Sequence, residues 1–280
     1  MNWYNSEEHL IKFDSHTHTL YSHDADKNVS VRSMCVSAID KGITHLAITD
    51  HYDINEVEEN IIPRPDLDAR RADIEAAAEE FKGKLHISHG IELGQAIQYP
   101  EQTNELLDKY RFDTVIASVH YMRGHDDFYH WNMSEYSLSE LEQAWAKYLV
   151  DLEETVDFGR ADVLAHFNYP LRYATIAGKI VDISFSYDVI ERICKKVISK
   201  DMLFEVNSSG FRQGVGAPLP DERIISIYRD CGGKLISVGS DAHTPKDVAA
   251  DFDITEKYIK KCGFDRIYFR HNGQTEDQKI

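Results

Sequence analysis

The sequence predicts an α/β fold in which parallel strands, each followed by a helix, form a closed or nearly closed barrel. Short apolar runs alternate with amphipathic helical patterns along the chain, and this alternation favours parallel pairing with right-handed crossovers. Polar residues directly follow strand after strand, as they do at the carboxyl-terminal face of barrel enzymes. A doubly wound open sheet is the alternative, but its strand ends would not all surround one pocket. The chain has 280 residues, a length at which α/β barrels are commonly one domain, so residues 1–280 are expected to form a single domain.

Seven strands are expected where short apolar runs are bounded by glycine, proline or polar residues. The runs cover residues 11–14, 43–49, 85–89, 113–119, 162–165, 202–206 and 234–238. The last run is entered through Gly232 and Gly233 and is followed by Asp241 and His243. Because side chains alternate along an extended chain, these two side chains should face the same side. A further strand is expected over residues 266–270.

Helices are expected between these strands. Their patterns cover residues 30–41, 67–81, 101–109, 138–156, 187–199, 221–231 and 245–261. Ser30 can cap the first helix, and Gly42 can stop it. Two long loops remain, one over residues 121–137 and one that passes through Pro170 and Arg172. The first is rich in His, Asp and aromatic residues, and we interpret it as functional.

Composition and charge limit the classes of function. The formal net charge of −17 argues against a nucleic-acid partner or an anionic membrane surface. No segment is apolar for long enough to cross a bilayer, and the N-terminal residues lack the regions of a signal peptide. The four cysteines form no Cys-x-x-Cys pair and fit reduced packing residues. These features predict a cytoplasmic protein.

Imidazoles and carboxylates gather at the predicted strand ends. The candidate metal ligands are His16, His18, Asp24, His51, Glu92, His120, His166, Asp241 and His243. Nitrogen and oxygen ligands without thiolates suit Zn, Mn or Fe(II). The set is too large for one ion, so two or three divalent metal ions are expected, and Glu92 can bridge two of them. Adjacent divalent ions favour phosphoryl chemistry, because they share the attacking and leaving oxygens of an in-line displacement.

A structural role is the alternative for each histidine taken alone. Any one of them could be a hydrogen-bonded structural residue, and a lone His-x-His motif would not decide the matter. Six histidines that directly follow five different strands are hard to explain in this way. His89 lies just before the Glu92 turn and could support a ligand by a hydrogen bond, but we do not expect it to bind a metal directly. His125 and His130 in the long loop could equally contact substrate or solvent.

The combination of motifs resembles the polymerase and histidinol phosphatase (PHP) superfamily. The motifs are His16-Thr17-His18-Thr19, Thr49-Asp50-His51, Gly90-Ile91-Glu92, Ser118-Val119-His120, Ala165-His166-Phe167 and Gly239-Ser240-Asp241-Ala242-His243. Within this superfamily, the segment from Glu205 to Arg212 and the chain length look like the monofunctional histidinol-phosphate phosphatases. The resemblance implies a distorted (β/α)7 TIM-like barrel, a trinuclear metal site at the carboxyl-terminal ends of the strands, and phosphomonoesterase activity.

The resemblance also implies how the ligands are shared. One metal would be held by His16, His18 and Asp241. Glu92 would bridge it to a second metal, which is completed by His120 and His166. The third would take His51, His243 and one residue of the turn over residues 22–25. Relatives place either Asp or His in this turn. This chain offers both His23 and Asp24, and the spacing after His18 favours Asp24.

Two arginines supply the positive charge expected of a phosphate site. Arg212 and Arg172 can match phosphate oxygens with their planar forks, and Ser209 is assigned to the same substrate site. Arg160 is a further candidate, for which a structural role is favoured. Glu92, Asp241 and His243 are the expected catalytic residues, and a hydroxide held by the metal ions would attack phosphorus in line with the leaving alkoxide.

The expected substrate is a small phosphomonoester, L-histidinol phosphate above others. Asp126, Asp127 and Phe128 in the long loop are positional candidates for contacts with its imidazole and ammonium groups. One alternative is a phosphatase of the same superfamily that acts on nucleotides or sugar phosphates. The other is a non-catalytic metal-binding protein that keeps the fold. The complete set of ligands weighs against the second alternative, because a decayed site would usually have lost some of them.

Overall fold

Parallel strands form a nearly closed barrel in the computed structural model, which describes residues 11–271 and 273–280. The N-terminal segment, for which the sequence predicts no signal peptide, lies outside the described residues. In spatial order the barrel strands are β1 (Phe13–Asp14), β2 (His45–Ile48), β4 (His86–Gly94), β5 (Thr114–Ser118), β6 (Val163–Leu164), β7 (Leu203–Asn207) and β8 (Ile236–Gly239). All of these neighbours pair in parallel. The predicted fold class is confirmed, and the open doubly wound sheet was the wrong alternative.

The second strand of the barrel is interrupted after β2, which distorts the barrel near the predicted ligand His51. β4 pairs first with β2 and then with β3 (His51–Asp53), in the same register. The break falls at Thr49-Asp50, and the Asp50 side chain accepts hydrogen bonds from Thr19, Ser22 and Arg70. His51 and Asp53 therefore belong to a separate short strand rather than to the turn that the sequence indicates.

Backbone contacts between the ends of β1 and β8 nearly close the barrel. Thr17 and Ala242 form a parallel bridge, and the amide of Asp241 donates to the carbonyl of His16 at 2.8 Å. These contacts lie at the carboxyl ends of the two strands. They therefore bring the His16-x-His18 and Asp241-x-His243 segments side by side, although the two segments are more than 200 residues apart in sequence.

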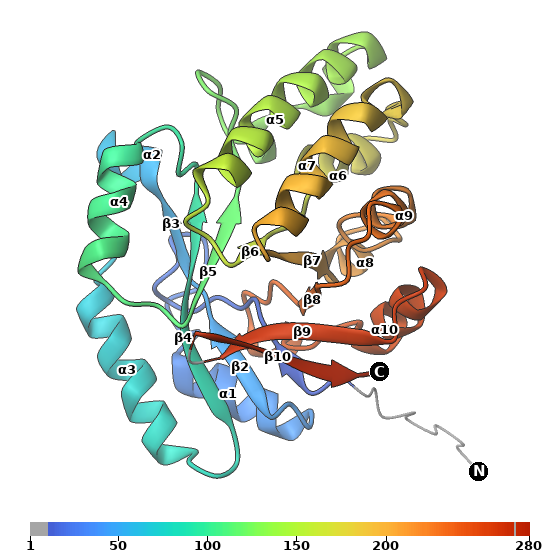
Figure 1. The fold of residues 1–280 in the computed structure, drawn as a ribbon. Coiled ribbons are helices and arrows are strands. Elements are labelled where there is room, and N and C mark those ends of the chain that lie inside the picture. Colours follow the sequence, from blue (N-terminus) through green and yellow to red (C-terminus); the bar gives the residue numbers. More distant parts are fainter. Residues whose placement is uncertain (1–10, 272) are drawn as a thin grey trace.

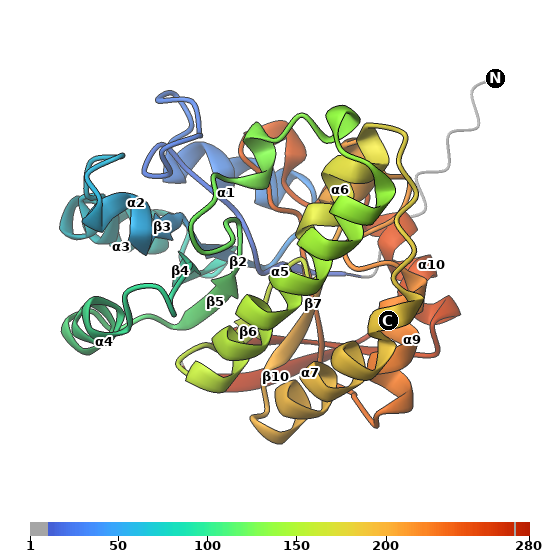
Figure 2. The same ribbon diagram turned by 90° about the horizontal axis from the view of Figure 1, so that it is seen from above.

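Helices surround the strands (Figures 1 and 2). The predicted helices correspond to α1 (Val31–Asp40), α3 (Leu67–Glu80), α4 (Pro100–Lys109), α5 (Leu138–Phe158), α7 (Tyr187–Ser199), α9 (Glu222–Asp230) and α10 (Phe252–Lys261). Ser30 caps α1 as expected, because its side chain accepts from the amide of Ser33. α10 begins later than predicted. Residues 245–247 form a separate 3-10 turn, and Asp251 has a left-handed φ of 62°, which interrupts the helix.

Three short helices occupy segments that the sequence indicates as loops or turns. They are α2 (Ile54–Glu58), α6 (Tyr169–Ile176) and α8 (Ser209–Arg212). Pro170 lies in the first turn of α6, where proline is compatible with a helix because the missing N–H has no partner there anyway. Residues 121–137 remain mostly irregular, with 3-10 turns at 128–130 and 133–135.

A C-terminal hairpin covers the amino-terminal end of the barrel. β9 (Arg266–His271), which the sequence predicts, pairs antiparallel with β10 (Gln274–Lys279), which it does not. Figure 1 shows the two strands side by side beneath β8. The ring of Phe269 lies 4.4 Å from that of Phe13 at the start of β1. The hairpin therefore covers the end of the barrel that is opposite the strand-end histidines.

The main apolar core lies between the strands and the outer helices, with Trp145, Tyr148, Phe204 and Tyr228 among its fully buried side chains. In the described part of the chain, no helix is both long and apolar enough to cross a membrane. The four cysteines are all free, and three of them are buried. This agrees with the packing role predicted for them.

Candidate metal centre

Glu92 comes together with His120 and His166, which follow β5 and β6. Glu92 lies inside β4, which continues to Gly94, and not, as the sequence predicts, in a turn after a strand that ends at residue 89. Glu92 Oε1 lies 2.9 Å from His166 Nε2 and 3.2 Å from His120 Nε2, and the two imidazole nitrogens are 3.4 Å apart. Around a tetrahedral ion with ligands at 2.0–2.2 Å, ligand atoms lie roughly 3.3–3.6 Å from one another. The three side chains form a group that can hold a metal ion.

The second oxygen of Glu92 faces a different group. Glu92 Oε2 lies 3.0 Å from His16 Nε2 and 3.4 Å from His18 Nε2, and His18 Nε2 lies 3.2 Å from Asp241 Oδ1. His16, His18 and Asp241 also form a possible metal-binding group. Glu92 thus presents one oxygen to each group, as a bridging carboxylate would. Its role as a bridge remains a prediction that this geometry supports.

A third group lies nearer the surface. His18, His51 and His243 can share an ion. Asp24 Oδ2 lies 3.1 Å from His243 Nε2 and 3.7 Å from His51 Nε2. His23 instead faces Asp53 and Glu56, and these three residues form another group that could hold a metal ion. Of the two candidates in this turn, Asp24 therefore lies with the third group, which supports the expectation from its spacing.

Several buried polar atoms in these groups lack a hydrogen bond in the described part of the chain. They are His16 Nε2, His18 Nε2, His51 Nδ1, Glu92 Oε2 and His243 Nε2. Buried polar atoms without partners are rare and costly. They converge on the same space, and their types are the ligands that Zn, Mn and Fe(II) prefer. The residues present therefore fit a set of divalent cations.

The electrostatics of the centre also favour bound positive charge. Burial alone would raise the pKa of Glu92, but the neighbouring His51 and His16 hold it well below its usual range. Against the effect of burial, Glu92 and Asp24 raise the pKa of His51 to about 10. The carboxylates of the centre thus stabilise cations among the imidazoles, whether these are protons or metal ions.

Hydrogen bonds from the ring nitrogens that face away from the candidate metal positions orient the imidazoles. His16 Nδ1 donates to Glu205 Oε1 at 2.7 Å, and His120 Nδ1 donates to Asp53 Oδ1 at 3.0 Å. Carboxylates of this kind fix the ring orientation and leave the other nitrogen free to bind a metal. Sequence reasoning did not assign this role to Glu205 or Asp53. Alternation along β7, which places Glu205 and Asn207 on one face, was the available signal for Glu205.

Both predicted arginines line the cleft above the centre. Arg172 is 9% exposed, packs against the edge-to-face rings of Tyr169 and Tyr173 at 4.5 Å from each centroid, and donates to Gln213. Its Nε has no hydrogen bond in the described structure. Arg212 Nη2 donates to the carbonyls of Ser240 and Asp241, while its Nη1 is also without a partner. Each guanidinium therefore keeps a donor available.

Other predicted substrate contacts receive less support. Ser209 is 0% exposed and does not line the cleft, so the structure gives no support for its contact with phosphate. Phe128 is buried in the core, and Asp126 lies in a neighbouring cavity. Only Asp127 of that trio lines the cleft. Arg160 pairs with Asp108 on the surface, as its structural interpretation expects.

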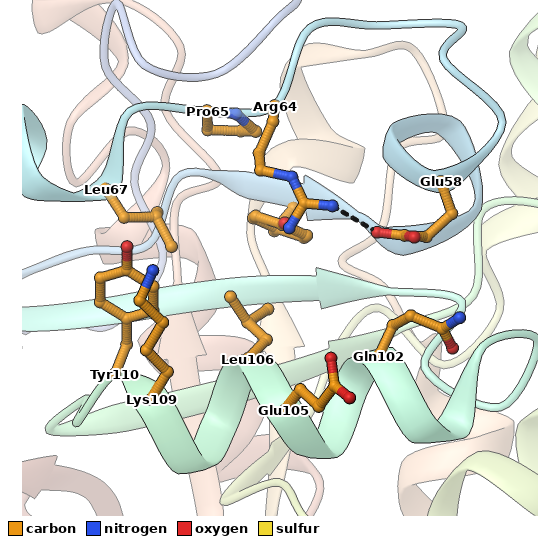
Figure 3. A pocket seen from close by; sticks show the side chains of 10 residues that line it. Glu58, Arg64, Pro65, Leu67, Gln102, Glu105, Leu106, Lys109 and Tyr110 are labelled. Atoms are coloured by element: carbon orange, nitrogen blue, oxygen red, sulfur yellow. Dashed lines mark hydrogen bonds and ion pairs between the residues drawn. The ribbon is translucent and has the colours of Figure 1, made fainter.

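The cleft has a volume of about 660 Å³ and opens at the carboxyl ends of the strands. A second cavity, of about 300 Å³, lies between α2, the start of α3, and α4 (Figure 3). Arg64 and Glu58 form an ion pair in it. Its lining contains no histidine, so the chemistry described above belongs to the first cleft.

Comparison with known proteins agrees with this geometry. Residues 14–209 match the family model described as the PHP domain. The histidinol-phosphatase of Lactococcus lactis is 26% identical over 264 residues, which cover 92% of this chain and 94% of that protein. The histidinol-phosphatase of Bacillus subtilis is 23% identical and covers 90% and 100%.

Solved structures share the fold. The Lactococcus lactis histidinol phosphate phosphatase, crystallised with Zn, L-histidinol and phosphate, superposes with a TM-score of 0.77 at 23% identity and covers 95% of this chain and 98% of that chain. A putative histidinol phosphatase from Listeria monocytogenes gives a TM-score of 0.74 at 20% identity, covering 87% and 99%. The motifs, the barrel and the family match agree. This chain belongs to the PHP domain family.

Proposed function

We propose that this protein is a metal-dependent phosphomonoesterase that hydrolyses L-histidinol phosphate to L-histidinol and phosphate. The observation that carries the proposal is the position of Glu92, whose two oxygens face two separate groups of imidazoles. The similarity to histidinol-phosphatases over about nine-tenths of the chain supports the choice of substrate. The four free cysteines fit the reducing conditions of the cytoplasm, which is the compartment we propose.

The nine predicted ligands would hold two or three divalent ions. His120 and His166 would hold one ion with Glu92, and the groups around Asp241 and Asp24 would hold the others. When bound, Zn, Mn or Fe(II) would acidify a water molecule for attack and draw charge from the phosphoryl oxygens. Glu205 and Asp53 keep the imidazole rings of His16 and His120 in the orientation that this binding needs.

The arginines bind and orient the phosphoryl group in this proposal. The Arg172 guanidinium packs against the two tyrosine rings, and its Nε makes no hydrogen bond within the described residues. The two carbonyls that Arg212 contacts fix one end of its fork and leave Nη1 for a phosphate oxygen. Donors fixed in advance stabilise charge that develops on the phosphoryl oxygens without reorganising during the reaction.

Asp241 and His243 line the cleft beside Arg212. Asp241 has a left-handed φ of 55°, a conformation that aspartate tolerates better than most residues. His243 Nδ1 contacts the backbone carbonyl of Asp241 at 3.0 Å, which fixes the His243 ring relative to the main chain at Asp241. We assign to this pair the role of orienting the water molecule that protonates the leaving alkoxide.

A phosphate-release assay over a panel of substrates tests the proposal. Protein purified without chelators is analysed for metal and then assayed with L-histidinol phosphate, nucleoside monophosphates and sugar phosphates. We expect more than one divalent ion per chain and the highest kcat/KM for L-histidinol phosphate. A higher kcat/KM for a nucleotide or a sugar phosphate would replace the substrate. Metal-loaded protein that releases no phosphate from any ester would refute the enzyme assignment.

A further inference from the structure

Two buried carboxylates line the cleft without belonging to the nine predicted ligands. Glu56, on α2, is 6% exposed, and Asp53, at the end of β3, is 1% exposed. Both lie on the wall formed by β3 and α2, and Asp53 Oδ2 is 3.8 Å from His51 Nδ1. The carboxylates therefore lie beside the candidate metal centre and not on a remote surface.

Glu56 has an oxygen that the described structure leaves unsatisfied. The hydroxyl of Tyr121 donates to Glu56 Oε1, whereas Glu56 Oε2 is buried and accepts no hydrogen bond. Within residues 11–271 and 273–280, no lysine or arginine lies within ion-pair distance of Glu56 or Asp53. Asp53 already faces the imidazoles of His51 and His120. Glu56 Oε2 faces only the ring of His23, at 3.9 Å, among the described residues, and a buried carboxylate oxygen left in this state is costly. This corner of the cleft is therefore built to receive positive charge.

His23 partly covers this corner. Its Nε2 lies 3.9 Å from Glu56 Oε2, too far for a hydrogen bond, and its side chain is 34% exposed. The ring therefore does not occupy Glu56 Oε2 with a hydrogen bond. Tyr121 holds the other oxygen of the carboxylate.

The cleft as a whole carries opposite charges on its two sides. Arg172 and Arg212 come from α6 and α8, beyond β6 and β7, and Arg212 donates to the carbonyl of Asp241. Glu56 and Asp53 come from α2 and β3, and Asp53 adjoins His51. The candidate metal groups lie along the cleft that both sides share. A ligand with an anionic phosphate at one end and a cationic nitrogen near it would match both sides.

We propose that Glu56, assisted by Asp53, binds the ammonium group of the substrate and so selects amino-alkyl phosphomonoesters. This assignment rests on the proposed function and extends it to a specificity-determining residue. In L-histidinol phosphate the amine sits on the carbon next to the phosphorylated one. A phosphate held at the metal groups and arginines therefore leaves the ammonium within reach of the neighbouring wall. Asp127, the loop aspartate that also lines the cleft, accepts at Oδ1 from the hydroxyl of Tyr169 and from the amide of Tyr129.

The test compares two esters and two matched variants. L-Histidinol phosphate is compared with imidazolylpropyl phosphate, which lacks only the amine. Glu56→Gln removes the charge but keeps an oxygen for Tyr121, so the fold is preserved. Glu58→Gln is the control, because Glu58 is on the same helix but pairs with Arg64 in the other cavity (Figure 3). Metal content is measured for every protein.

We expect Glu56→Gln to lower kcat/KM for L-histidinol phosphate by about tenfold to a hundredfold, the value of one charge-assisted contact. Its kcat/KM for imidazolylpropyl phosphate should stay within about twofold of wild type, since no transition-state contact to that ester is lost. Glu58→Gln should behave as wild type. Equal losses on both esters, or no loss on either, would overturn the assignment. A fall in metal content would assign Glu56 to a metal ion and would also overturn it.

A binding measurement separates this inference from the proposed function. Metal-loaded wild type should bind L-histidinol more tightly than imidazolylpropanol in calorimetry, and Glu56→Gln should abolish that difference. If the protein hydrolyses no phosphomonoester but the binding difference is found, the proposed function fails and the ammonium site stands. If hydrolysis is found but the two alcohols bind wild type equally, the ammonium site fails and the function stands.

Discussion

Replacing Glu92 by Gln is the most informative single change at the metal centre. Glu92 is fully buried, and each of its oxygens lies within 3.4 Å of at least two imidazole nitrogens. The amide keeps the shape of the side chain, but it turns one oxygen into an NH2 group that faces a cation site. One partner of a buried charged cluster is thereby removed, which costs about 3–5 kcal/mol, or roughly 150- to 5,000-fold in metal affinity.

We therefore expect Glu92→Gln to lose metal and activity together. Elemental analysis after reconstitution should return less metal per chain than wild type, and kcat should fall with it. Glu205→Gln is the matched control, because Glu205 contacts His16 but no metal position directly. Removing a residue that only orients a metal ligand typically lowers metal affinity or activity by about 10- to 100-fold. A Glu92→Gln protein with full metal content and near-normal turnover would show that Glu92 does not bridge two ions.

Three further predictions concern other residues. Asp24→Asn should reduce metal content and rate more than His23→Ala, and the reverse order in elemental analysis would transfer the ligand role to His23. Arg212→Ala should lower kcat/KM for phosphomonoesters by at least about tenfold with metal content intact, and Arg212→Lys should restore part of the loss; a change below about threefold would make Arg212 a structural residue. Burial, and then Arg70, lower the pKa of His89 from 6.5 to about 4. The folded state thus keeps His89 neutral, and stability is lost as the pH falls from 6.5 toward 4. Between pH 7 and pH 5, the free energy of unfolding measured with urea should fall by about 1–2 kcal/mol less in His89→Leu than in wild type. Identical pH profiles of the two proteins would refute this.

The strand-end ligands could be predicted because their signal is local. His120 directly follows an apolar run, and so does the segment with Asp241 and His243, so the barrel topology alone brings them together. For the turn that holds His23 and Asp24, the sequence offers only the spacing after His18, which favours Asp24. The position of His243, contributed by a distant segment, supports this prediction.

The short helices could not be predicted from periodicity. α2 has five residues and α8 has four, too few for a helical pattern to be recognised. Pro170 indicates a loop in the sequence, yet it occupies a position in the first turn of α6 that proline tolerates. This difference matters for Arg172, because the helix places the rings of both Tyr169 and Tyr173 against its guanidinium.

Outer residues of the site depend on contacts far apart in sequence. Glu205 reaches His16 across 189 residues, and Tyr121 reaches Glu56 across 65. Alternation along β7 indicates the face on which Glu205 lies but not its partner, and the contact between Tyr121 and Glu56 leaves no periodic pattern in the chain. The C-terminal strand was missed for another reason, since Gln274–Lys279 is polar throughout and pairs at the surface with β9.

The central claim is that more than one divalent ion must bind before this protein hydrolyses L-histidinol phosphate. It is tested most directly by stripping the protein with a chelator and measuring phosphate release as Mn or Zn is returned in known equivalents. We expect almost no activity up to one equivalent per chain and a steep rise between one and three, because Glu92 faces two groups at once. Full activity with one equivalent or with none would contradict the account.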